Sequence, residues 1–122
     1  QMIRVFRASE WADRVPVAVE VPFELPIGPI VLAGRADAVF ATPDGGYEVV
    51  DWKTGHPPDD KARLAQHVQL ACYRLAWSRQ HAVDLAKVHA ALFYASSGQT
   101  VRPVDLLDEQ GLLTLIEALP PG

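Results

Sequence analysis

Two aspartates and a lysine lie close to a loop-like segment in one stretch of the chain. The sequence GRADAVFATPDGGYEVVDWKTG occupies positions 34–55, with Asp37 near its start and Asp51 and Lys53 near its end. Between them, TPDGG has the Pro, Asp and Gly content that is typical of a hairpin loop. If the loop folds the flanking segments together, the two carboxylates meet and form a candidate metal site.

The length of this loop decides whether the two carboxylates share a face of the sheet. With a five-residue loop, Ala41 pairs with Tyr47, and Asp37 then lies directly opposite Asp51. A four-residue loop changes the register by one residue and places Asp37 opposite Trp52, on the wrong face. We predict the five-residue register, with the two carboxylates about 5 Å apart.

The paired carboxylates are a candidate site for a divalent cation, because two like charges this close are unfavourable unless a cation lies between them. Mg²⁺ or Mn²⁺ is expected, since both prefer hard oxygen ligands, and the backbone carbonyl of Trp52 is a candidate third ligand. A bound cation of this kind activates water and polarises a phosphoryl oxygen. Lys53, on the same face as Asp51, can orient the attacking hydroxide or neutralise charge on phosphorus. The pattern therefore indicates phosphodiester hydrolysis.

Three predicted strands would position these residues. Alternation of apolar residues predicts strands at 15–25, 29–41 and 47–53. The second and third strands form the antiparallel hairpin. Within the third strand, alternation directs Trp52 to the face opposite Asp51, into the core. The residues expected to share that core are Ala36, Ala38 and Val50.

A long helix and three shorter elements are predicted to follow. Helix-forming residues run from Lys61 to about His81, with Asp59 or Asp60 as the N-cap. The apolar stripe of this helix is predicted at Leu64, Val68, Ala71 and Leu75. Two more strands, 87–96 and 100–106, and a short helix, 108–119, complete the chain. The order predicts the α/β class, a central mixed β-sheet of about five strands with flanking helices.

Composition is that of one soluble globular domain spanning residues 1–122. The chain is 49% hydrophobic and 21% charged, which argues against disorder. No apolar run reaches the roughly 18 residues of a membrane helix, and no signal-peptide pattern is present, so we expect a cytoplasmic location and no membrane contact. Cys72 is the only cysteine, which excludes an intrachain disulfide and a four-cysteine iron-sulfur cluster.

Several segments together resemble the RecB-like branch of the PD-(D/E)XK nucleases. The segments GRAD (34–37), VVDWKTG (49–55) and QLACY (69–73) match its G-x-x-D, V-V-D-x-K-T-G and Q-x-x-x-Y motifs in order and spacing. VEVPF (19–23) is similar to the family's preceding E-x-x-F strand, with Glu20 as the equivalent acid in a supporting role. The resemblance covers about positions 17–80.

The resemblance implies a restriction-endonuclease-like core and a role for each matched residue. Asp37 and Asp51 would bind the metal ions, and Lys53 would assist catalysis beside them. Gln69 and Tyr73, four residues apart on one helix face, would shape the site and contact DNA. The family's iron-sulfur variants need four cysteines, so that form is excluded here.

The resemblance also implies a biological setting. Domains of this branch commonly form the C-terminal part of UvrD-like helicase-nucleases of the RecB, AddA and AdnA/AdnB type, which resect double-strand breaks. We therefore expect a Mg²⁺- or Mn²⁺-dependent deoxyribonuclease of exonuclease type, acting in recombinational repair. Its expected partners are DNA, ATP-dependent helicase domains of the same chain, and a second helicase-nuclease subunit.

Two alternatives remain open. The family usually has an upstream helix with a metal-binding histidine, but QMIRVFRASEWADRV contains no histidine, so we expect the N-terminal helix to be missing. That absence and the net charge of −4 favour a nuclease-like module that no longer cuts and instead binds DNA or braces a partner subunit. An unrelated α/β domain with a chance motif would not place Asp37 and Asp51 on one face. His56 is interpreted as an exposed loop residue.

Overall fold

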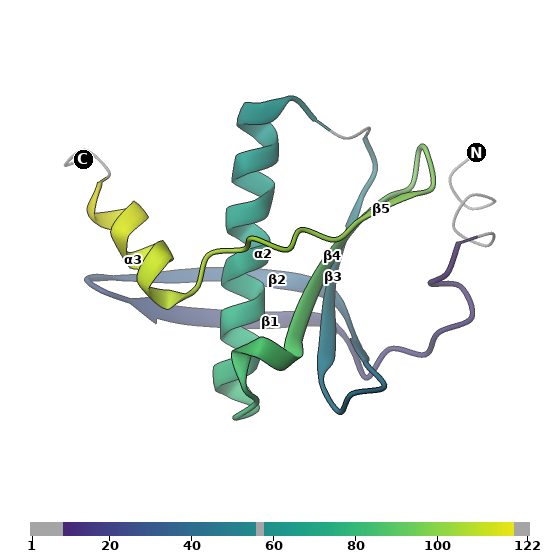
Figure 1. Ribbon diagram of the computed structural model, residues 1–122, viewed down its shortest axis with the longest axis horizontal. Helices are drawn as coiled ribbons and strands as arrows, with labels where there is room; N and C mark the ends of the chain where they lie inside the picture. Colours follow the sequence, from purple (N-terminus) through teal and green to yellow (C-terminus); the bar gives the residue numbers. More distant parts are fainter. Residues whose placement is uncertain (1–8, 56–57, 119–122) are drawn as a thin grey trace.

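A five-stranded sheet with the order β1-β2-β3-β4-β5 forms the centre of the computed structural model, which describes residues 9–55 and 58–118. Its strands are β1 (Ala18–Ile27), β2 (Ile30–Ala41), β3 (Tyr47–Lys53), β4 (Val88–Tyr94) and β5 (Gln99–Val101). Strands β3 and β4 pair in parallel, and the other neighbours pair antiparallel (Figure 1). The mixed sheet confirms the predicted α/β class.

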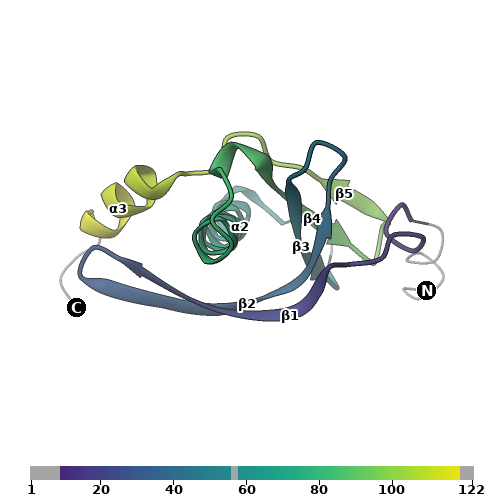
Figure 2. The ribbon, with the colours of Figure 1, turned by 90° about the horizontal axis from the view of Figure 1, so that it is seen from below.

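Two helices pack on the sheet. Helix α2 (Asp60–Gln80) makes the crossover that parallel pairing of β3 and β4 requires. The 3₁₀ turn η1 (Leu85–Lys87) leads from α2 into β4, and the shorter helix α3 (Glu109–Glu117) follows β5. Asp59 caps α2 by accepting the backbone N–H of Ala62 at 3.1 Å, as one of the two predicted caps. In Figure 2 the β1–β2 hairpin extends beneath α2 toward α3.

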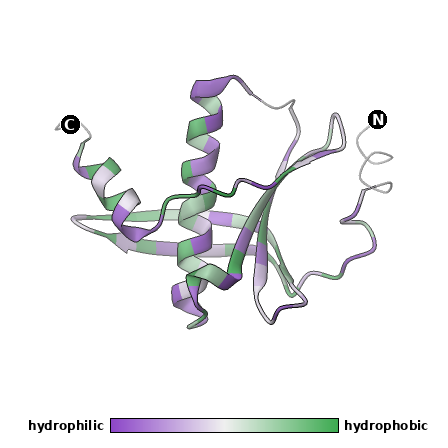
Figure 3. Cartoon of the chain, in the orientation of Figure 1, coloured by the Kyte–Doolittle hydropathy of each residue, from purple (hydrophilic) through white to green (hydrophobic). Residues whose placement is uncertain are grey.

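The centre of the sheet is buried on both faces. On the α2 side, Val39, Val49 and Leu92 of the strands pack against Leu70 and Trp77 of the helix. The opposite side holds a second cluster, which consists of Trp11, Ala38, Phe40, Val50, Ala91 and Phe93. Trp52 is half-buried against this second cluster, as strand alternation predicts. Strand β4 is correspondingly hydrophobic over most of its length in Figure 3.

Both strands of the β1–β2 hairpin break their alternation at one position. The ladder pairs Val19 with Ala38 and Val21 with Ala36, but it forms no pair between Glu20 and Asp37, and Glu20 has a left-handed φ of 47°. As a result, Ala36 packs on the α2 side and Ala38 on the opposite side, so the expectation that they share one core was wrong. The irregularity lies where β2 leaves β3 and the hairpin passes under α2 (Figure 2).

The helix stripe was predicted only in part. Leu64 is 62% exposed, and the buried residues of α2 begin at Leu70, because the first turns extend beyond the sheet (Figure 1). The first of these turns is hydrophilic in Figure 3. From Leu70 to Trp77 the helix is buried over a wide face, so Ala71 and Leu75 lie in the core as predicted.

Two strand boundaries also differ from the predictions. Strand β1 begins at Ala18 rather than at residue 15. Strand β5 ends at Val101, two residues before Pro103, which has no N–H to donate to a ladder. Among the described residues, no helix is both long and apolar enough to span a membrane. Residues 1–8, which bear on the expected missing helix, and His56 lie outside the described residues.

Candidate metal centre

The hairpin loop brings Asp37 and Asp51 together. Ala41 pairs with Tyr47 and Ala38 with Val50, which confirms the five-residue register. Asp37 and Asp51 occupy the next position, where the backbone pairing of β2 and β3 has ended. Here the Asp37 Oδ2 accepts the backbone N–H of Trp52 at 2.8 Å. At this position of β2, the Asp37 carboxylate thus accepts the N–H that the backbone of a neighbouring strand would otherwise accept.

The two carboxyl groups interact directly. The pKa of Asp51 is raised from 3.8 to about 6, first because the group is buried and second because it shares a hydrogen bond with Asp37. Lys53 lowers the pKa of Asp51, because its Nζ lies 2.8 Å from the Asp51 Oδ2. Only 6% of Asp51 is exposed. In the absence of a cation, Asp51 therefore holds its proton to a higher pH than an ordinary aspartate does.

Lys53 lies between the acid pair and helix α2. Its ammonium group contacts Asp51 on one side and donates to the Gln69 Oε1 at 3.2 Å on the other. Its backbone carbonyl accepts the N–H of Ala95 at 2.8 Å, which fixes the end of β3 against the end of β4. The structure therefore brings together Lys53, Asp51 and Gln69, of which only Lys53 and Asp51 were predicted to share a face.

Tyr73 completes the same side of the site. Its ring packs edge-on against Phe23 at a centroid distance of 4.8 Å. Burial raises the pKa of Tyr73 to about 12, and the charges of Asp51 and Asp37 act in the same direction. A Cβ at Gly34 would lie 3.0 Å from the Phe23 ring and 3.3 Å from the Tyr73 ring. The glycine of the G-x-x-D segment thus allows β2 to approach the helix closely beside the acid pair.

Glu20 is not brought into the centre. It lies at the position opposite Asp37 in the interrupted ladder, but its side chain is exposed. Within residues 9–55 and 58–118, no group of three or more His, Cys, Asp or Glu side chains is arranged to hold a metal. The carboxylate pair is the acidic part of the candidate centre in this part of the chain.

The donor set nevertheless fits a hard divalent cation. The Asp51 Oδ2 is buried and lies 2.8 Å from the Lys53 Nζ. The N–H of Trp52 points to Asp37, and in an extended strand the carbonyl of a residue points to the same side as its N–H. Two carboxylates and this carbonyl are oxygen ligands of the kind that Mg²⁺ and Mn²⁺ accept together with water.

Sequence reasoning did not assign a role to Tyr94, which lies beside Lys53. The tyrosine pairs with Lys53 in the β3–β4 register, and its hydroxyl donates to the Gln66 Oε1 at 2.5 Å. Gln66 lies one turn before Gln69, so its position on that helix face is the signal from which this contact could have been expected. The tyrosine itself lies in an apolar strand with no motif around it.

The comparisons with known proteins agree with this architecture. Residues 1–117 match the family model of the PD-(D/E)XK nuclease superfamily, so the chain belongs to that superfamily, whose members are typically metal-dependent nucleases. No curated protein matches the chain. The crystal structure of SSO0001 has a similar fold, with a TM-score of 0.55 and 23% sequence identity over 82% of this chain. The aligned region is 48% of that longer chain.

Membership of the superfamily and the observed register remove one of the alternatives. An unrelated α/β domain with a chance motif would not place Asp37 opposite Asp51, and it would not match the superfamily over nearly the whole chain. The remaining choice is between a nuclease that cuts and a related module that does not.

Proposed function

We propose that this domain hydrolyses DNA phosphodiester bonds with Mg²⁺ or Mn²⁺ held by Asp37, Asp51 and the backbone carbonyl of Trp52. The observation that carries the proposal is the carboxylate pair of buried Asp51 and half-buried Asp37, with the ammonium group of Lys53 in contact with Asp51. Such a pair is costly to the fold unless a cation neutralises it. Membership of a nuclease superfamily supports the same conclusion.

Each residue has a distinct part in the proposed reaction. A divalent cation supplies a water of lowered pKa and polarises the scissile phosphate. Lys53 contributes a positive charge against the negative charge that develops on the phosphate oxygens. Gln69 fixes that ammonium from the helix side, and the ring of Tyr73 walls the site beside Asp37. Glu20, exposed at the bend, keeps only a supporting role.

The finer assignment rests on the motifs. We place the chain in the RecB-like branch, as a single nuclease domain spanning residues 1–122 of a cytoplasmic helicase-nuclease. Its partners would then be DNA, the helicase domains of the same protein, and a second helicase-nuclease subunit. The reaction would be exonucleolytic and would serve double-strand-break resection. The segments GRAD, VVDWKTG and QLACY support this assignment.

A second candidate is a module that binds DNA or braces a partner without cutting. Two observations favour it. The described residues cluster only two metal-binding carboxylates, and the whole chain has a net charge of −4. DNA binding by an acidic domain requires basic surface from elsewhere.

Metal binding followed by cleavage separates the two candidates. Calorimetry with Mn²⁺ is carried out on the wild type, on Asp51→Asn, and on Asp105→Ala, which removes an exposed aspartate outside the centre. End-labelled single-stranded DNA is then incubated with the same samples. We expect wild-type binding and cleavage, both retained in Asp105→Ala, with cleavage reduced at least about 100-fold in Asp51→Asn.

The other outcomes are equally informative. Metal binding without cleavage would contradict the nuclease proposal for this domain alone and favour the non-cutting module. No Mn²⁺ binding by the wild type would contradict a preformed metal centre. Products shortened stepwise from one labelled end would support the exonuclease assignment, whereas internal fragments would contradict it.

A further inference from the structure

Tyr94 and Lys53 are neighbours at the ends of two parallel strands, and both reach helix α2. Their paired register places the two side chains on the same face of the sheet. Lys53 donates to Gln69 at 3.2 Å, and Tyr94 donates to Gln66 at 2.5 Å. Gln66 and Gln69 are one helical turn apart. Two adjacent hydrogen bonds therefore join the strand ends to one turn of α2.

Of these two hydrogen bonds, the one between Tyr94 and Gln66 has the more buried residue. Tyr94 is 2% exposed and packs in the α2-side cluster, whereas Gln69 is exposed. Burial raises the pKa of Tyr94; Arg63 opposes this shift and Asp51 adds to it. The hydroxyl is therefore a hydrogen-bond donor throughout the neutral pH range.

This link lies just before α2 becomes fully buried. Residues 60–65 of the helix are exposed, Gln66 and Val68 are half-buried, and full burial begins at Leu70. Gln69 lies between Val68 and the buried Leu70, and contacts of this turn with the strand ends add to the packing that sets its position. The hydrogen bond from Tyr94 to Gln66 is such a contact, with a buried and rigid donor.

We propose that Tyr94 is a positioning residue of the candidate metal centre and acts through Gln66. Its hydroxyl holds the turn of α2 that carries Gln69, and Gln69 holds the ammonium group of Lys53 beside Asp51. The catalytic consequence rests on the proposed nuclease function. The placement of Lys53 is a physical property of the folded chain and can be measured whether or not the domain cuts DNA.

Lysine-selective NMR measures that placement directly. The chain contains three lysines, Lys53, Lys61 and Lys87, so ¹³Cε labelling gives three signals that Lys→Arg variants assign. Tyr94→Phe removes only the hydroxyl, and we expect it to shift the Lys53 signal while leaving that of Lys87 unchanged. Tyr47→Phe is the matched control, because Tyr47 lies at the opposite end of β3, and it should leave Lys53 unchanged.

Kinetics on the same proteins tests the catalytic consequence. We expect Tyr94→Phe to lower kcat for DNA cleavage about 5- to 30-fold, with the KM for DNA and the Kd for Mn²⁺ unchanged. Gln66→Leu should have the same effect. The double variant should lose no more than either single variant, because both changes break one link.

The possible results separate this inference from the proposed function. If Tyr94→Phe shifts the Lys53 signal but the wild type does not cleave DNA, the positioning role is supported and the nuclease proposal is contradicted. An unchanged Lys53 signal in folded Tyr94→Phe and Gln66→Leu would overturn the positioning role, as would losses in kcat that add in the double variant. If Tyr94→Phe does not fold, the Lys53 signal in Gln66→Leu decides the question by the same criterion.

Discussion

Burial of Asp51 should contribute a pH dependence to the stability of the metal-free protein that a single substitution can isolate. The folded-state pKa of Asp51, about 6, lies above its ordinary value of 3.8. The folded protein therefore holds the proton more tightly, and this stabilising contribution is full below about pH 4 and is lost as the pH rises through about 6. We expect Asp51→Asn to be more stable than the wild type by about 1 to 3 kcal/mol at about pH 7.5, with the difference vanishing near pH 4.

Urea denaturation of the two proteins at a series of pH values, without metal, measures this difference. Other carboxyl groups shift in the opposite direction, since hydrogen bonds from Arg102 and from Thr42 lower the pKa of Glu10 and of Asp44 respectively. Their contributions are common to both proteins and cancel in the comparison. A stability difference that stays constant with pH would contradict the raised pKa.

Lys53 should affect catalysis without being needed for metal binding. Its ammonium group competes with a cation for the same Asp51 oxygen, at 2.8 Å. We expect Lys53→Met to lower kcat for DNA cleavage roughly 100-fold or more, while Mn²⁺ binds with equal or higher affinity because the competing charge is gone. Calorimetry and single-turnover cleavage measure the two quantities. Lys87→Met is the control, and joint loss of binding and cleavage in Lys53→Met would indicate a structural role instead.

Among the elements, the β2–β3 hairpin fixes the register on which the site depends. A Cβ at Gly46 would lie 2.1 Å from the backbone oxygen of Lys87, which cannot move without disturbing η1. We expect Gly46→Ala to lower the free energy of unfolding by about 2 kcal/mol or more. Gly55→Ala is the control, since a Cβ there meets nothing within 4 Å, and it should be close to neutral. Urea denaturation compares the two, and equal stabilities would contradict the close packing of the loop.

The elements also explain which features the sequence could and could not predict. Loop composition and alternation were enough to derive the register that brings Asp37 opposite Asp51, because both are local properties. The bend at Glu20 and Asp37 was not predictable, since it depends on a paired irregularity in two strands whose residues look regular individually. Leu64 was misassigned for a similar reason: periodicity indicates a helix face but not how far the helix extends beyond the sheet.

The contact between Tyr94 and Gln66 was missed for a related reason. It joins residues 28 positions apart, and it exists only because β3 and β4 pair in parallel with Lys53 beside Tyr94. The sequence pattern within a strand is compatible with many registers between that strand and its neighbours. The motif residues could therefore be identified from the sequence, whereas the contact made by Tyr94 could be recognised only from the assembled sheet.

At the scale of the whole molecule, the candidate metal centre and the cluster around Trp11 lie on opposite sides of the sheet. The acid pair, Lys53 and Gln69 lie on the α2 side, whereas the segment before β1 covers the other side with Trp11. Trp11 is 1% exposed, packs on Phe40 at a centroid distance of 5.1 Å, and donates from its indole N–H to the Thr100 hydroxyl at 3.1 Å. This cover is therefore an integral part of the core.

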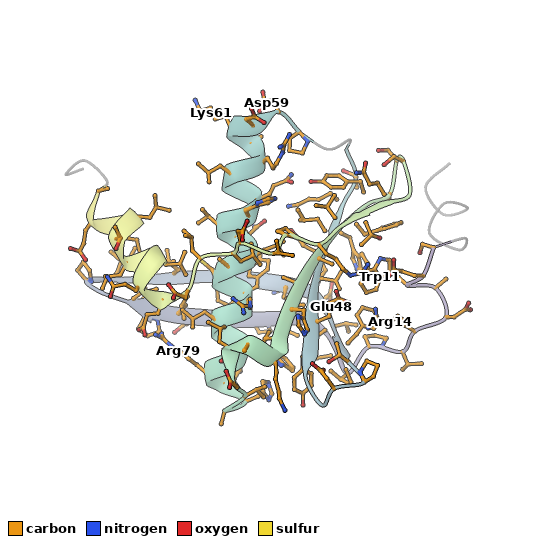
Figure 4. All side chains as sticks on the ribbon, in the orientation of Figure 1. Trp11, Arg14, Glu48, Asp59, Lys61 and Arg79 are labelled. Atoms are coloured by element: carbon orange, nitrogen blue, oxygen red, sulfur yellow. The ribbon has the colours of Figure 1, made fainter. Side chains whose placement is uncertain are left out.

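Charged side chains reinforce that cover. Arg14, in the same segment as Trp11, donates to the buried carboxylate of Glu48 at 3.2 Å (Figure 4). Arg102, after β5, donates to the same carboxylate at 2.8 Å. Both guanidinium groups also lie over the Trp11 ring, at 4.7 Å and 5.2 Å from its centroid. Segments near the two ends of the described chain are thus joined to β3 at one carboxylate.

Removal of the Trp11 ring should therefore lower stability without altering the metal centre. We expect Trp11→Ala to lower the free energy of unfolding by about 3 to 5 kcal/mol, because it leaves a cavity against Phe40 and Trp52. Trp11→Phe keeps an aromatic ring and should lose less, chiefly the hydrogen bond to Thr100, at about 1 kcal/mol. Urea denaturation measures both losses, and calorimetry at low temperature measures Mn²⁺ affinity in the folded fraction. An unchanged Mn²⁺ Kd in the destabilised Trp11→Ala would establish that the two faces act independently, whereas a weakened Kd would mean that the cover also positions the acid pair through β3.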